Sequence, residues 1–133
     1  MILNQVTLPA VDLRASIDFY KRLGLQQIVD SPHYSRFECP QGDATFSLHR
    51  VPPPFSPHPD YTIYFEIDRL DEFVARRVAE GMVFDRLPED MPWKWREARL
   101  RDPAGNVICL YRAGDFRKYP PWRIEPPPGR GQR

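Results

Sequence analysis

Apolar side chains in the first half of the chain recur at helical spacing in one segment and alternate with polar ones in several others. The helical segment lies between Asp12, a residue type that caps helix N-termini, and Gly24, a residue type that ends helices. Its apolar face is formed by Leu13, Ile17, Tyr20 and Leu23. The alternating segments predict strands at residues 3–8, 25–29, 34–39 and 44–50.

The second half of the chain repeats this order of elements. Asp68 and Gly81 bound a second predicted helix, and they follow Asp12 and Gly24 by 56 and 57 residues. The predicted strands are residues 61–67, 82–87, 95–101 and 106–112. A repeat of this length indicates one duplicated unit, so the sequence predicts an α+β fold of two tandem βαβββ modules.

Ten of the 16 prolines gather in two stretches, residues 52–59 and 120–128, that suit neither helix nor strand interiors. We therefore predict a single domain at residues 1–113, of a size that one hydrophobic core supports. Its predicted parts are module one at 1–51, a proline-rich connector at 52–59 and module two at 60–113. Residues 114–133 are predicted to form a C-terminal proline-rich tail that carries the large apolar groups Phe116, Tyr119, Trp122 and Ile124.

Each predicted strand has an aliphatic face and a polar or aromatic face, because alternate side chains point to opposite sides. The aliphatic faces are expected to pack beneath the helices. The opposite faces are rich in hydroxyl, amide and aromatic groups, which favours a pocket for a polar organic molecule over a plain solvated surface. The predicted ligand-binding residues are Gln5, Thr7, Ser47, His49, Thr62, Tyr64, Trp95, Glu97, Arg99, Cys109 and Tyr111.

Charge and composition narrow the class of partner. The 19 basic and 18 acidic side chains give a net charge of +1, which argues against a nucleic-acid binder. No apolar run is long enough to span a membrane, and the N-terminus does not have the pattern of a signal peptide. Two cysteines do not make a disulfide framework, so we expect a cytoplasmic protein.

Two motifs resemble those of the vicinal oxygen chelate superfamily, which contains glyoxalases, bleomycin resistance proteins and extradiol dioxygenases. The first is Gln-Val-Thr-Leu-Pro-Ala-Val-Asp-Leu-Arg-Ala-Ser-Ile-Asp-Phe-Tyr-Lys-Arg-Leu-Gly at residues 5–24, and the second is Asp-Pro-Ala-Gly-Asn at 102–106. The resemblance covers roughly residues 1–113. It implies that the two modules form a curled eight-stranded mixed sheet around a central cleft, and that the protein is a homodimer like many relatives.

The resemblance also implies where a metal would be bound. Metal enzymes of the superfamily carry His, Gln or Glu at four strand positions, which in this chain are Gln5, Ser47, Thr62 and Cys109. Neutral Gln, Ser and Thr are poor ligands for hard divalent ions, and one thiol does not replace the missing groups. We therefore expect no metal and no cofactor, although a site rebuilt from His49, Glu66 or Glu97 stays open.

Three other groups of residues can be interpreted either as functional or as ordinary structural residues. His49 and Glu66 are weak candidates for acid–base catalysis, and the alternative for His49 is a pocket or rim residue. Arg99 shares a face with Trp95, which suits capture of an anionic or aromatic ligand, or else an ordinary solvated strand. Cys39 and Cys109 are expected to be inert thiols because no neighbouring cation is evident in the sequence.

The function expected from these observations is binding of a small polar or aromatic organic molecule in a metal-free cup. The alternative is an enzyme on the same scaffold, a lyase, isomerase or dioxygenase that is similar to lactoylglutathione lyase. A third possibility is a subunit that contacts another protein through its aromatic tail. The apolar tail, together with the habits of the superfamily, predicts a homodimer.

Overall fold

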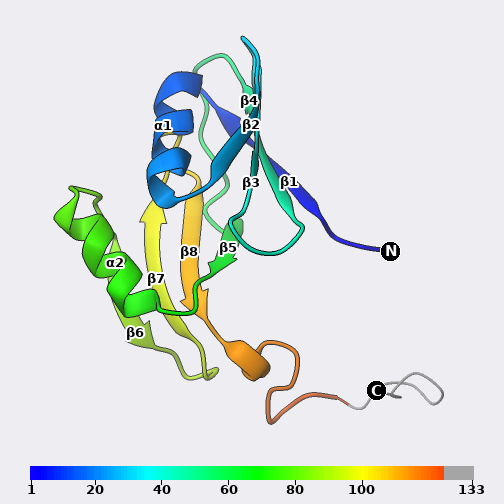
Figure 1. Ribbon diagram of the computed structural model, residues 1–133, viewed down its shortest axis with the longest axis vertical. Coiled ribbons are helices and arrows are strands. Elements are labelled where there is room, and N and C mark those ends of the chain that lie inside the picture. The colour runs from blue at the N-terminus through cyan, green and yellow to red at the C-terminus, as the bar shows by residue number, and fades with distance from the viewer. Residues whose placement is uncertain (125–133) are drawn as a thin grey trace.

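The computed structural model describes residues 1–124 and contains two units with the same order of elements (Figure 1). The first unit consists of β1 (Gln5–Ala10), α1 (Leu13–Leu23), β2 (Gln26–Asp30), β3 (Tyr34–Glu38) and β4 (Thr45–Arg50). The second consists of β5 (Thr62–Glu66), α2 (Leu70–Ala79), β6 (Arg86–Asp90), β7 (Arg96–Arg101) and β8 (Val107–Arg112). A short 3-10 helix, η1 (Gly114–Phe116), follows β8. The predicted pair of βαβββ modules is confirmed, while part of the predicted tail, residues 125–133, lies outside the described residues.

The eight strands form two mixed four-stranded sheets. Sheet A has the order β1-β4-β3-β2 and sheet B the order β5-β8-β7-β6. In each sheet the first and last strands of the module are parallel neighbours, and the other pairs are antiparallel. The sheets are curled, as expected, but they are two separate ladders rather than one continuous eight-stranded ladder.

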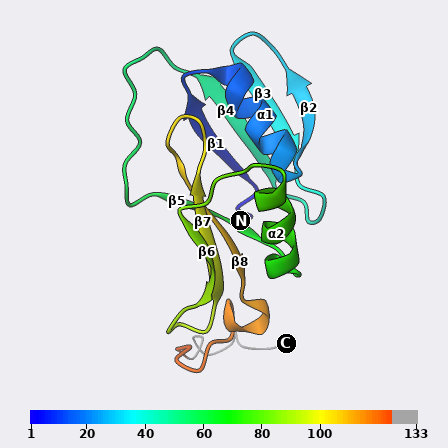
Figure 2. The same ribbon diagram turned by 90° about the vertical axis from the view of Figure 1, so that its left-hand side faces the viewer.

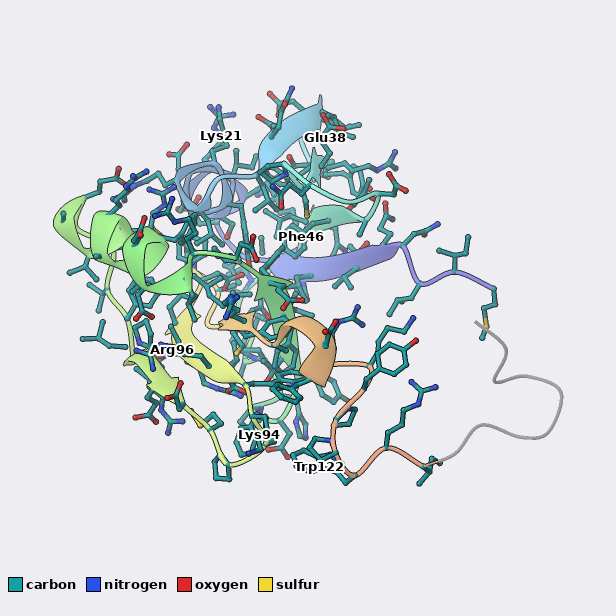
Figure 3. The ribbon with its side chains drawn as sticks, turned by 60° about the horizontal axis from the view of Figure 1, so that its bottom comes forward. Lys21, Glu38, Phe46, Lys94, Arg96 and Trp122 are labelled. Carbon is teal, nitrogen blue, oxygen red and sulfur yellow. The ribbon has the colours of Figure 1, made fainter. Side chains whose placement is uncertain are left out.

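One hydrophobic core is shared by both modules, and both helices lie on the same side of the molecule (Figure 2). Its centre is marked by Phe46 of β4, whose ring lies 5.8 Å from the ring of Phe65 of β5 (Figure 3). The core includes the buried aliphatic side chains Leu48, Ala98, Leu100, Ile108 and Leu110, as strand alternation predicted. Because these side chains point inward, the polar and aromatic faces of the sheets point away from the core.

A buried polar network joins the two sequence motifs. The Tyr20 hydroxyl of α1 donates to Asp102 Oδ2 over 2.7 Å, and Asn106 Nδ2 donates both to the same oxygen and to the carbonyl of Pro9. Asp102 Oδ1 accepts the backbone N–H groups of Ala104 and Asn106, which shapes the β7–β8 turn. These hydrogen bonds between motif residues therefore link module one to module two.

Two predictions about element ends need correction. Asp12 caps α1 as predicted, since its carboxylate accepts the N–H of Ala15. Asp68 does not cap α2: the N-cap residue is Arg69, which makes no side-chain capping bond. The strand predicted at 82–87 lies instead at 86–90, because β6 is an edge strand where Pro88 is tolerated.

Neither helix within residues 1–124 has the length and apolar character that crossing a membrane would require.

Candidate functional site

The predicted site residues are divided between the outward faces of the two sheets. We call these open face A and open face B. Open face A carries the predicted residues Gln5, Thr7, Ser47 and His49 on β1 and β4. Open face B carries Thr62, Tyr64, Glu66, Trp95, Glu97, Arg99, Cys109 and Tyr111. The structure thus brings the residues of open face A together on sheet A and those of open face B together on sheet B. One continuous sheet around a central cleft, as expected from the sequence, is not formed.

Three aromatic rings are in mutual contact on open face B, and we call them the aromatic cluster. Trp95 and Tyr111 are stacked, with ring centroids 4.7 Å apart and planes inclined by 23°. Tyr64 meets both rings edge-on, at 5.9 Å from Trp95 and 5.6 Å from Tyr111. Tyr111 is buried, whereas Tyr64 remains exposed and Trp95 partly so. The cluster therefore offers ring faces and edges on which a planar molecule can pack.

Beside the aromatic cluster, a buried carboxylate balances the charge of Arg99. Glu97 is only 1% exposed, and it accepts hydrogen bonds from Trp93 Nε1 at 2.7 Å and from Arg99 Nη2 at 3.3 Å. Arg99 pairs with Cys109 on the neighbouring strand, and Cys109 pairs with Tyr64. The guanidinium that the sequence analysis proposed for anion binding thus has its own counter-ion.

Cys109 has the properties of an inert thiol. It is fully buried, and burial, followed by the nearby Glu97 carboxylate, raises the pKa of the Cys109 thiol to about 12. Burial likewise raises the pKa of Cys39. A thiol that stays protonated at neutral pH is a weak nucleophile.

Glu66, a candidate acid–base residue, is engaged with the start of the tail. One of its oxygens accepts the backbone N–H groups of Ala113 and Gly114, at 2.8 and 2.9 Å, and the other lies 3.9 Å from Arg117. Burial, and then the Glu66 charge, raises the pKa of Tyr111. His49, the other candidate, is exposed near the end of β4, and its side chain makes no hydrogen bond or ion pair with residues 1–124.

Open face A contains two polar residues that the sequence analysis did not single out. The Tyr34 hydroxyl lies 2.6 Å from Ser47 Oγ and accepts a hydrogen bond from Arg36 Nε at 2.9 Å. The hydrogen bond with Ser47, and to a smaller extent that with Arg36, lowers the pKa of Tyr34. The repeat held a signal for them, because Tyr34 and Arg36 precede Glu97 and Arg99 by the same 63 residues that separate Gly42 from Gly105.

The four positions at which related enzymes hold a metal do not fit that role here. Gln5 and Ser47 are already hydrogen-bonded to Thr45 and Tyr34, and Thr62 offers only a neutral hydroxyl. The Cys109 thiol with the raised pKa is a poor donor, because metals bind the thiolate. No group of three or more His, Cys, Asp or Glu side chains within residues 1–124 is placed to hold a metal ion.

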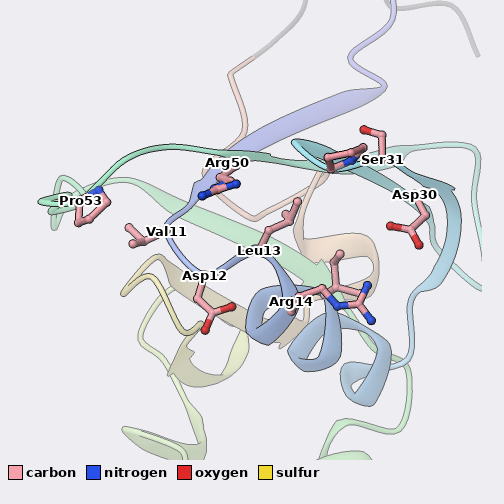
Figure 4. A pocket seen from close by; sticks show the side chains of 10 residues that line it. Val11, Asp12, Leu13, Arg14, Asp30, Ser31, Arg50 and Pro53 are labelled. Carbon is pink, nitrogen blue, oxygen red and sulfur yellow. The ribbon is translucent and has the colours of Figure 1, made fainter.

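Two of the cavities on the molecule bear on the predicted site. The larger, of about 680 Å³, is at the start of α1, where its exposed charged residues are Asp12, Arg14, Asp30 and Arg50 (Figure 4). It contains none of the predicted ligand-binding residues. A cavity of about 500 Å³ lies between the modules and is lined by apolar groups together with the polar residues Gln41, Tyr64, Glu66, Asp68 and Arg69. Its edge therefore adjoins the aromatic cluster.

Comparison with known proteins identifies the superfamily. The family model "Glyoxalase/Bleomycin resistance protein/Dioxygenase superfamily" matches residues 2–110. A glyoxalase/bleomycin resistance protein/dioxygenase from Nocardioides has 22% identity and a TM-score of 0.72, with 94% of this chain and 90% of that chain covered. No match was found among curated proteins.

Two further solved structures share the fold. A bleomycin resistance determinant encoded on transposon Tn5 has 21% identity and a TM-score of 0.70, with 84% of this chain and 98% of that chain covered. A lactoylglutathione lyase from Agrobacterium tumefaciens has 22% identity and a TM-score of 0.68, with 84% and 92% covered. The match of the family model over most of the chain shows that the protein belongs to the glyoxalase/bleomycin resistance protein/dioxygenase superfamily.

Proposed function

We propose that this protein binds a small planar organic molecule on its open faces without a metal ion. The observation that carries the proposal is the aromatic cluster on open face B, where Tyr64 and Trp95 remain accessible beside the ion pair of buried Glu97 and half-buried Arg99. Ring faces bind planar molecules, and a few fixed polar groups orient them. A bleomycin resistance determinant has the same fold.

We further propose that two copies of the chain form the binding cup between them. Open face A and open face B belong to different sheets and point away from a common core, so a partner copy can set its face A opposite face B. Large apolar side chains support an interface: Trp122 is 56% exposed and lies on the tail at the outer end of module two (Figure 3). The free Cys39 and Cys109 favour a reducing compartment, and we propose the cytoplasm.

The dimer is tested by light scattering and sedimentation equilibrium. The wild-type protein is expected to have the mass of two chains at micromolar concentration. Trp122→Ala is expected to weaken the dimer at least tenfold, because truncating an interface tryptophan costs about 2 kcal/mol or more. Tyr61→Ala is the matched control, since Tyr61 is 74% exposed on the connector side. A monomeric wild-type protein would reject the dimer, and equal effects of both substitutions would remove the tail from the interface.

Ligand binding is tested by mass spectrometry of molecules that co-purify with the protein, followed by calorimetric titration of each. A Trp95→Ala variant is expected to lose most of the affinity, on the scale of about 1–3 kcal/mol for a stacked ring. Elemental analysis of protein purified without added metal is expected to find no stoichiometric Ni, Zn, Fe or Mn. About one ion per chain retained through dialysis would contradict the metal-free site.

An acid–base enzyme is the second candidate, and the Tyr34 phenol is the observation that favours it. Its pKa is lowered by the hydrogen bonds with Ser47 and Arg36, so it can exchange a proton more readily than an ordinary tyrosine. A lactoylglutathione lyase shares the fold. Incubation of the protein with its co-purified molecule separates the candidates: an unchanged mass and NMR spectrum supports binding alone, and conversion that stops in Tyr34→Phe supports catalysis.

A further inference from the structure

Arg36 on open face A is a half-buried positive charge with no counter-ion among residues 1–124. Its Nε donates to the Tyr34 hydroxyl, and its guanidinium lies 5.4 Å from the centre of the Tyr34 ring. Its two terminal amino groups make no hydrogen bond or ion pair within residues 1–124. Glu38, two residues further along the same face, is exposed and makes no ion pair with it. The terminal N–H groups of the guanidinium, which can bind a carboxylate or phosphate side by side, are therefore not used by residues 1–124.

The repeat shows that this charge is uncompensated because one partner differs between the modules. Arg36 pairs with Ser47 on β4, just as Arg99 pairs with Cys109 on β8. In each module the arginine is hydrogen-bonded to the side chain two residues before it. That partner is the buried carboxylate Glu97 in module two and the neutral phenol of Tyr34 in module one. The arginine is present in both modules, but only module two supplies its anion.

The surroundings of Arg36 hold it in a defined position. Ser47 is fully buried and fixes the Tyr34 hydroxyl over 2.6 Å, and that hydroxyl in turn accepts the Nε–H of Arg36. A side chain that is already ordered loses less conformational freedom when it binds a ligand. The terminal amino groups are thus preorganised at the polar surface of face A.

We propose that Arg36 is an anion-binding site, and that the molecule bound by this protein is an aromatic anion such as a carboxylate, phosphate or sulfonate. This inference rests on the proposed function, since the ring of the same molecule packs on the aromatic cluster. A partner copy that sets face A opposite face B brings Arg36 and the aromatic cluster into one cup. The sequence analysis considered Arg99 for this role, but Glu97 already balances the charge of Arg99.

The test compares two probes of the same shape by isothermal titration calorimetry. The probes are 2-naphthoate, an aromatic anion, and 2-naphthamide, its neutral counterpart. The wild-type protein is expected to bind 2-naphthoate about 10- to 100-fold more tightly than 2-naphthamide, the scale of a charge-assisted hydrogen bond. Arg36→Gln is expected to lose that preference while it still binds 2-naphthamide. Arg36→Lys, which keeps the charge but not the fork, is expected to retain part of the preference.

Arg50→Gln is the matched control, because Arg50 is exposed and lines the cavity at the start of α1 instead of face A. It is expected to keep the full preference for 2-naphthoate. Equal binding of both probes by the wild-type protein, or a preference that survives in Arg36→Gln and Arg36→Lys, would overturn the anion site and leave the proposed function standing. Absence of binding for both probes would overturn the proposed function together with this inference.

Discussion

The Tyr20 hydroxyl shows how a single residue of a sequence motif can serve the assembly of the fold. Its ring is fully buried, its O–H donates to Asp102, and burial raises the pKa of the phenol well above its usual range. Asp102 also holds the β7–β8 turn through Asn106. A motif that resembles those of metal enzymes is thus used here to join α1 to the other module. The motif is therefore evidence for the superfamily fold. It says nothing about which chemistry the open faces perform.

We predict that Tyr20→Phe lowers the free energy of unfolding by about 1–3 kcal/mol, because it removes one hydrogen bond from a buried carboxylate. Urea denaturation of both proteins measures this difference. Tyr61→Phe is the control, and it is expected to have almost no effect, since Tyr61 is largely exposed. A loss below about 0.5 kcal/mol in Tyr20→Phe would mean that water replaces the missing partner of Asp102.

At the same scale, strand alternation predicted which way side chains point better than it predicted what they contact. Cys109 and Tyr111 were correctly assigned to the face opposite Ile108 and Leu110. The pairing of Arg99 with Glu97 was not predicted, because adjacent positions on one face can make an ion pair or serve a ligand equally well. Arg36 was overlooked, although its position in the repeat matches that of Arg99.

Among the elements, the two helices begin in different ways despite the matching Asp12 and Asp68. Asp12 accepts the N–H of Ala15, whereas α2 begins two residues after Asp68, with Arg69 as its N-cap. We predict that Asp12→Ala lowers the free energy of unfolding by about 1 kcal/mol, the usual value of a lost capping bond. Asp68→Ala is the matched control and is expected to change it by only a few tenths of a kcal/mol. Equal losses in chemical denaturation would contradict this difference in capping.

The misplaced β6 strand shows the limit of local sequence signals for elements. Pro88 has no N–H to donate, but β6 is the outer strand of sheet B, where a missing N–H breaks no ladder on the free side. The register between β6 and β7 also shifts between Arg86 and Glu89. Edge position is a property of the assembled sheet, so the residues of β6 alone did not reveal it. The central strands β7 and β8, whose alternation is regular, were predicted to within one residue.

For the whole molecule, the repeat predicted two modules but not how their polar faces are arranged. A central cleft within one chain requires those faces to oppose each other, whereas the shared core turns each of them outward. Whether the polar faces oppose each other depends on which core faces of the strands pack together. Here Phe46 and Phe65 pack together, but the alternation of side chains along each strand would be the same in either arrangement. If two chains complete one cup, each cup takes Arg36 from one chain and the aromatic cluster from the other. A mixture of two defective variants then tests the arrangement directly.

We predict that Arg36→Gln and Trp95→Ala each bind 2-naphthoate weakly alone, and that a co-refolded equal mixture regains strong sites. Random pairing makes about half of the dimers mixed, and each mixed dimer carries one cup with both residues intact, so about one quarter of all cups recover. The stoichiometry of tight binding in calorimetry measures this fraction. A mixture of Arg36→Gln with Arg36→Lys is the control and is expected to regain no full-strength site. If the first mixture also regains none while the proteins are dimeric, the ring and the anion are bound by the same chain, and the cup lies within one protomer.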